Sequence, residues 1–129
     1  MLSKDNRLVT DTQIKNGYRT KFQYKNSHCK FYLSPTEDLN FRLLVVISKK
    51  VYKKANKRNR CKRKVYAMYE SLKSNNRLPK NIDCIVQIQN KNLLNLKQDD
   101  LLDAVVKPVS QLYKKLLDSQ LYRNGKMPK

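Results

Sequence analysis

The sequence holds few of the residues from which catalytic centres are usually built. It has only two glycines, Gly17 and Gly125, so it cannot form the glycine-rich loop that cradles phosphates in nucleotide-binding enzymes. Its single histidine, His28, has no evident partner for acid–base catalysis. These shortages argue against a nucleotide-dependent or histidine-based enzyme.

Cysteines are also few and isolated. Cys29, Cys61 and Cys84 form no Cys-x-x-Cys pair, and His28 lies beside only one of them. A zinc site needs about four ligands at close spacing. The pattern therefore predicts buried or idle reduced thiols.

Acidic residues are scarce: 10 Asp+Glu stand against 29 Lys+Arg, which gives a formal net charge of +19. The one acidic cluster, Asp99, Asp100 and Asp103, opens a predicted helix, where carboxylates stabilise the N-terminus. We therefore do not expect the chain alone to catalyse, because a metal-dependent nuclease needs carboxylates placed for metal ions. A charge this large opposes the compact state by self-repulsion. It indicates a polyanionic partner, nucleic acid first and an anionic membrane surface second.

Long hydrophobic runs are absent. The longest, residues 43–47, is far too short to span a bilayer, and the N-terminus has no apolar run of signal-peptide length. We expect a cytoplasmic protein.

What remains is typical of a globular chain. The 129 residues, 40% hydrophobic and 30% charged, are enough for one domain with a modest core. We find no repeat and no linker. We expect a single domain over residues 1–122 and a basic, disordered tail over residues 123–129.

Apolar periodicity predicts one sheet with helices against it. The expected elements are a short helix over 10–17, one or two strands over 21–33, a strand over 41–47, a helix over 53–73, a strand over 82–88 and a helix over 98–121. The continuous apolar run at 41–47 predicts a central strand buried on both faces. Pro108 should kink the last helix. This order indicates an α+β or α/β sandwich, and the general rule for the strand–helix–strand unit at 41–88 is a right-handed crossover.

The helix over 53–73 changes character along its length. Cys61, Val65, Met68 and Leu72 fall on one stripe, which predicts packing against the sheet. The first half carries basic side chains on nearly every face. The last helix has an apolar face of its own, made by Leu101 or Leu102, Val105, Val109, Leu112 and Leu116.

The basic residues of this region have no acidic counterparts. No Asp or Glu occurs between Asp38 and Glu70. Like charges repel along a helix, and mixed signs normally relieve that repulsion. Because nothing within the segment does so, we expect phosphates to compensate. The cations are Arg42, Lys49, Lys50, Lys53, Lys54, Lys57, Arg58, Arg60, Lys62, Arg63 and Lys64.

The residue types fit RNA. Arginine holds phosphate bidentately and stacks on bases, which lysine does not do. Asn59, between Arg58 and Arg60, offers a donor and an acceptor that can read a base or a 2′-hydroxyl. We interpret the segment as an RNA-binding surface.

The string Ser48-Lys49-Lys50, then Lys54-Ala55, then Arg58-Asn59-Arg60-Cys61-Lys62-Arg63 resembles the signature of the bacterial ribonuclease P protein. The resemblance implies an αβββαβα α+β sandwich with a left-handed βαβ crossover, against the general rule. It also implies a protein that binds the catalytic RNA subunit and the 5′ leader of precursor tRNA, is monomeric outside the complex, and leaves Mg²⁺-dependent hydrolysis to the RNA. The RNA-binding residues would be Ser48, Lys49, Lys50, Lys53, Lys54, Lys57, Arg58, Asn59, Arg60, Lys62 and Arg63.

The family also has a cleft for the tRNA leader, lined by aromatic residues of the first helix and the sheet. By resemblance, the corresponding residues here are Ile14, Tyr18, Tyr24, Phe31 and Tyr32. The alternative is that these aromatics are ordinary core.

Three positions depart from the family pattern. Tyr66 stands where an arginine is usual, Tyr52 where a small residue is common, and Asn56 where a valine is usual. Two other functions remain open: a different RNA-binding protein, such as a ribosomal protein or RNA chaperone, and a polybasic protein of membrane surfaces.

Overall fold

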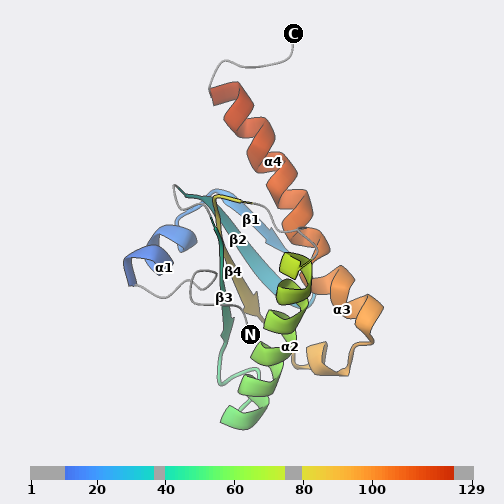
Figure 1. Cartoon of the computed structure of the whole chain (residues 1–129). Helices are drawn as coiled ribbons and strands as arrows, with labels where there is room; N and C mark the ends of the chain where they lie inside the picture. Colours follow the sequence, from blue (N-terminus) through green and yellow to red (C-terminus); the bar gives the residue numbers. More distant parts are fainter. Residues whose placement is uncertain (1–10, 37–39, 75–79, 124–129) are drawn as a thin grey trace.

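The computed structural model describes residues 11–36, 40–74 and 80–123, and it shows one four-stranded sheet with helices on both faces (Figure 1). Residues 124–129 of the predicted tail lie outside the described residues. The elements are α1 (Asp11–Tyr18), β1 (Phe22–Lys25), β2 (Cys29–Pro35), β3 (Phe41–Ile47), α2 (Ala55–Ser74), β4 (Ile82–Ile88), the 3-10 helix η2 (Lys91–Asn95), α3 (Gln98–Val105) and α4 (Lys107–Arg123).

The sheet has the order β1-β2-β4-β3. β3 pairs in parallel with β4 across the α2 crossover, and the other two pairings are antiparallel. Helices α2, α3 and α4 lie on one face and α1 on the other (Figure 1). The predicted α+β sandwich is confirmed, while the handedness of the crossover stays a prediction.

One prediction about the sheet is wrong: β3 is an edge strand, not a central one. Its residues alternate between buried and half-buried, whereas β4 is buried on nearly every residue and lies in the interior of the sheet. The apolar run of β3 is continuous for a different reason. Its outer-face residues, Leu44 and Val46, pack in the small cluster around Tyr32 and Ile85.

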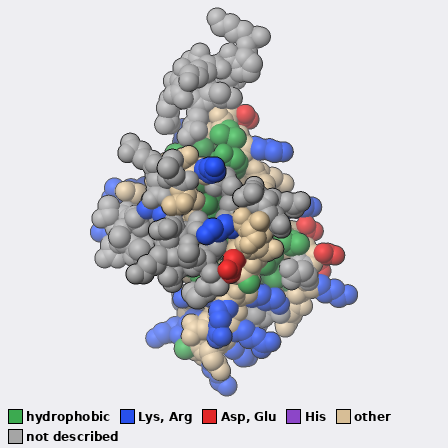
Figure 2. Space-filling view, in the orientation of Figure 1, with side chains coloured by type: hydrophobic (Ala, Val, Ile, Leu, Met, Phe, Trp, Pro, Cys, Tyr) green, Lys and Arg blue, Asp and Glu red, His purple; other side chains and the backbone are tan. Residues whose placement is uncertain are grey.

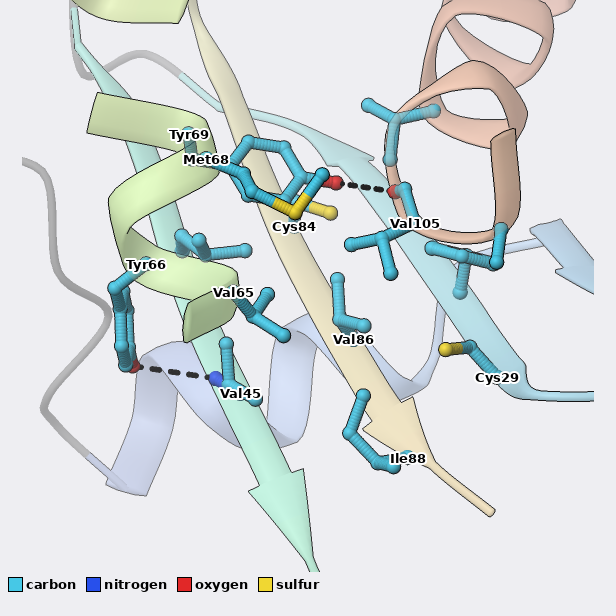
Figure 3. Close-up of a cluster of buried hydrophobic side chains, with 14 of the residues drawn as sticks. Cys29, Val45, Val65, Tyr66, Met68, Tyr69, Cys84, Val86, Ile88 and Val105 are labelled. Carbon is cyan, nitrogen blue, oxygen red and sulfur yellow. Dashed lines mark hydrogen bonds between the residues drawn. The ribbon is translucent and has the colours of Figure 1, made fainter. Parts of the chain in front are cut away.

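The main core lies between the sheet and the three helices (Figure 3). Cys61, Val65 and Met68 of α2 are buried in it, as the stripe predicts. The thiols of Cys29, Cys61 and Cys84 are free and buried. Burial raises the pKa of Cys29 to about 12 and that of Cys61 to about 11, so both thiols stay protonated near neutral pH.

The last helix is divided in two at Val106, close to Pro108. Proline has no N–H to donate, so the carbonyl of Ala104 loses its helical partner. Asn26 Nδ2 donates to this carbonyl over 2.9 Å. The hydroxyl of Tyr69 in α2 donates to the next carbonyl, that of Val105, over 2.7 Å (Figure 3). Side chains from two other elements thus satisfy the groups that the break exposes.

Candidate nucleic-acid interface

The first turns of α2 extend past the ends of β3 and β4 (Figure 1). Lys57 lies four residues before Cys61, on the helix stripe that further along packs on the sheet. Because the sheet has ended at this level, the stripe can carry a lysine where the core would require an apolar residue. The overhang explains how one helix is basic at its start and amphipathic afterwards.

Lys and Arg side chains gather at the lower end of the molecule in Figure 2, over this first half of α2. We call the predicted RNA-binding residues here, Ser48 to Arg63, the basic surface. Among the described residues, no carboxylate forms an ion pair with its lysines or arginines. The members that are exposed are Ser48, Lys49, Lys50, Lys53, Lys54, Lys57, Asn59, Arg60 and Arg63, and those half-buried are Arg58 and Lys62.

Arg42, although basic and nearby in sequence, does not belong to this surface. It lies directly opposite Asp83 in the β3–β4 register. Its Nε donates to Asp83 Oδ1 over 2.6 Å and its Nη2 to Oδ2 over 2.8 Å, a bidentate pair. The side chains are only 13% and 8% exposed. The arginine thus neutralises the one buried carboxylate among the described residues.

Arg58 has an internal role as well. Its Nη1 donates to the carbonyls of Tyr52, over 2.8 Å, and Lys53, over 2.9 Å. The side chain thereby fixes the loop that precedes α2. Arg58 as a whole is half-buried, whereas Lys53, Lys54 and Lys57 are exposed.

Tyr66, the residue that replaces a usual arginine, turns inward. It is 7% exposed, and its hydroxyl accepts the backbone N–H of Val45 over 3.2 Å (Figure 3). Val45 belongs to the edge strand β3, whose outward N–H groups have no neighbouring strand. The tyrosine therefore covers a sheet edge, and the basic surface ends before it.

The predicted leader cleft is brought together only in part. Ile14, Tyr18 and Tyr32 meet on the α1 face, beside the fully buried Ile85. The rings of Tyr18 and Tyr32 contact edge-to-face with centroids 4.9 Å apart. Burial raises the pKa of Tyr18, and the neighbouring Tyr32 raises it further by a smaller amount. The hydroxyl of Tyr18 therefore stays protonated at neutral pH and can donate a hydrogen bond.

The prediction that Phe31 and Tyr24 line the same cleft is wrong. Phe31 is completely buried in the core on the other face of the sheet. Tyr24 lies opposite Phe31 in the β1–β2 register, so the two side chains share that face. Side chains alternate along a strand, so Tyr32 and Phe31 cannot both face α1.

Sequence reasoning also missed a row of side chains on the α1 face that is polar on three of the four strands. Lys25, Lys30, Gln87 and Val46 lie side by side across the four strands, two residues from the row of Tyr32. Lys30 Nζ lies 5.1 Å from the centroid of the Tyr32 ring. The alternation of side chains along β2 could have indicated Lys30, because it places residues 30 and 32 on the same face of the sheet.

The donor set does not suit a divalent cation. No group of three or more His, Cys, Asp or Glu residues that could hold a metal ion occurs in the described ranges. Magnesium prefers carboxylate, phosphate and water oxygens, whereas the basic surface offers cations and a carboxamide. Among the described helices, none is long and apolar enough to cross a membrane.

Solved structures of ribonuclease P proteins share this fold. A ribonuclease P protein from Staphylococcus aureus, a mutant with defective mRNA degradation activity, superposes with a TM-score of 0.66 at 22% identity, over 83% of this chain and 90% of that chain. The protein from Thermotoga maritima gives a TM-score of 0.55 at 17% identity, over 78% of this chain and 91% of that chain. At these identities the likeness shows the fold alone.

The family of this chain is shown by comparison of its sequence. No curated protein sequence matches the chain closely enough to count. The family model of ribonuclease P, however, matches residues 2–114, which include every described strand and the whole basic surface. The chain therefore belongs to the ribonuclease P family.

Proposed function

We propose that this chain is the protein subunit of ribonuclease P, and that the basic surface binds the catalytic RNA subunit. Family membership links the chain to an endoribonuclease complex. The observation that supports the proposed role is the basic surface itself. It holds exposed lysines and arginines at one end of the molecule with no carboxylate paired to them among the described residues. RNA phosphates would relieve that repulsion.

The α1 face would hold the 5′ leader of precursor tRNA. The half-buried Tyr18 offers aromatic surface, the buried Tyr32 packs against its ring, and Lys30 lies beside Tyr32. Proteins that bind single strands combine stacking rings with cations in this way. The β3–α2 loop follows directly from the end of β3. The row that contains Lys30 and Gln87 and the basic surface therefore lie at the same end of the sheet. An RNA partner and its substrate would thus contact neighbouring parts of the protein at this end of the sheet.

The RNA would carry out the hydrolysis. In this proposal its phosphates bind the Mg²⁺ that hydrolysis requires, and the protein lowers the repulsion between RNA subunit and substrate. The side chains of the basic surface position and neutralise phosphates, and none of them acts on the scissile bond. We further propose that the protein is a monomer outside the complex and works in the cytoplasm.

The test is reconstitution with a bacterial ribonuclease P RNA. We expect cleavage of precursor tRNA at a low Mg²⁺ concentration at which the RNA alone is inactive, because the protein supplies cations that Mg²⁺ would otherwise provide. Cleavage of the 5′ leader is followed by gel electrophoresis. RNA binding without any stimulation would instead favour another RNA-binding role.

A further inference from the structure

A hollow of about 500 Å³ lies under the overhanging start of α2, between the β3–α2 loop and η2. The sequence did not indicate it, because its two walls are more than thirty residues apart in the chain. The lining residues are Val51, Tyr52, Lys53, Lys54, Lys57, Arg60, Lys91, Asn92 and Asn95. We call this hollow the α2–η2 pocket.

Hydrogen bonds hold the walls of the α2–η2 pocket. The hydroxyl of Tyr52 donates to the carbonyl of Lys91, which ties the β3–α2 loop to η2. Arg58 fixes the same loop from the helix side. At the other wall, Asn90 accepts the N–H of Asn92 over 2.8 Å and so caps η2. Contacts within the protein therefore fix the walls of the pocket without a ligand.

The charge of the pocket is of one sign. Its lining includes the cations Lys53, Lys54, Lys57, Arg60 and Lys91 and no carboxylate. Unpaired like charges around one hollow favour an anion. The exposed carboxamides of Asn92 and Asn95 add donors and acceptors that can read a base edge.

We propose that the α2–η2 pocket seats one nucleotide of the RNA partner, with its phosphate among Lys57, Arg60 and Lys91. This inference rests on the proposed function and extends it, because it adds residues of η2 to the RNA-binding site on α2. The volume suits a nucleotide, because ligand pockets are typically about 300–1,000 Å³. An RNA chain fits better than a free nucleotide, because Lys57 and Arg60 also belong to the basic surface.

Lys91→Ala tests the phosphate contact. Removing one phosphate contact lowers the slope of log affinity against log salt by about 0.7–0.9, which amounts to roughly five- to eightfold weaker binding at 0.1 M salt. The matched control is Lys114→Ala, which removes another exposed lysine, from α4. Affinity for ribonuclease P RNA is measured at several salt concentrations. If Lys91→Ala left the slope unchanged while Arg60→Ala still weakened binding, the proposed role of the α2–η2 pocket would be overturned. The proposed function would still stand.

Crosslinking tests the same pocket without relying on charge. The native cysteines are completely buried, so Asn95→Cys offers the one accessible thiol among the described residues for a photoreactive azidophenacyl group. We expect this derivative to crosslink to the RNA subunit, and the control Gln111→Cys, at an exposed position of α4, not to do so. Failure of Asn95→Cys to crosslink in a complex that still assembles would contradict the inference.

Discussion

A protein carrying Lys57→Ala, Arg60→Ala and Arg63→Ala is expected to bind ribonuclease P RNA roughly 100- to 500-fold more weakly at 0.1 M salt. All three side chains are exposed on α2. Each lost phosphate contact should lower the slope of log affinity against log salt by about 0.7–0.9, so the slope itself should fall by about 2–3. The measurement is a series of binding titrations over a range of salt concentrations.

The control for this variant removes the same charge elsewhere. Lys107, Lys114 and Lys115 are exposed on α4, away from the basic surface. Their replacement by alanine keeps the net charge of the two triple variants equal. Both variants should unfold at nearly the parent temperature, since exposed side chains contribute little to stability. Equal losses of affinity in the two variants would mean that only total charge matters, and would contradict a localised binding surface.

Replacing Asp83 by alanine is expected to lower the free energy of unfolding by about 3–5 kcal/mol. The change leaves the guanidinium of Arg42 buried without its bidentate carboxylate partner, which is the costly way to break a buried ion pair. The thermal midpoint should fall by at least about 10 °C in a domain of this size. Urea denaturation followed by circular dichroism measures the effect.

Removing both partners should cost less than removing one. In Arg42→Met with Asp83→Leu, no charge is left buried, and apolar side chains of similar volume can replace the pair. The exposed acid Asp118 of α4, which lies away from any helix N-terminus, serves as a control for the loss of a carboxylate when it is replaced by alanine. A loss below about 1 kcal/mol in Asp83→Ala would show that solvent already screens Arg42.

Local patterns predicted the elements well because each depends on neighbours in sequence. The strands at 41–47 and 82–88 and the buried stripe of α2 follow from periods of two and 3.6 residues. The break near Pro108 follows from the chemistry of a single residue. These features required no knowledge of distant partners.

Features that depend on distant pairing were not predictable. The edge position of β3 depends on which strands pair, and the buried role of Arg42 depends on Asp83 in another strand. The α2–η2 pocket needs Lys91 to lie near Lys57. Phe31 was misplaced for a simpler reason, because a single aromatic residue does not reveal which face of a strand it occupies.

Two departures from the family pattern acquire structural meaning in this chain. Tyr66 covers the edge of β3, and Tyr52 joins the loop before α2 to η2. Tyr66, at 7% exposed, is not placed to bind RNA directly, whereas the equally buried Tyr52 forms part of the lining of the α2–η2 pocket. Tyr52 fixes the loop that carries part of the basic surface, and Tyr66 lies where that surface ends on α2.

Lysine modification with and without ribonuclease P RNA tests the basic surface most directly. The extent of acetylation of each lysine is read by mass spectrometry at low salt. We expect the RNA to protect Lys49, Lys50, Lys53, Lys54 and Lys57, while Lys107, Lys114 and Lys115 of α4 stay reactive. Protection confined to α4, or lysines at 49–57 that react equally with and without RNA, would contradict the account.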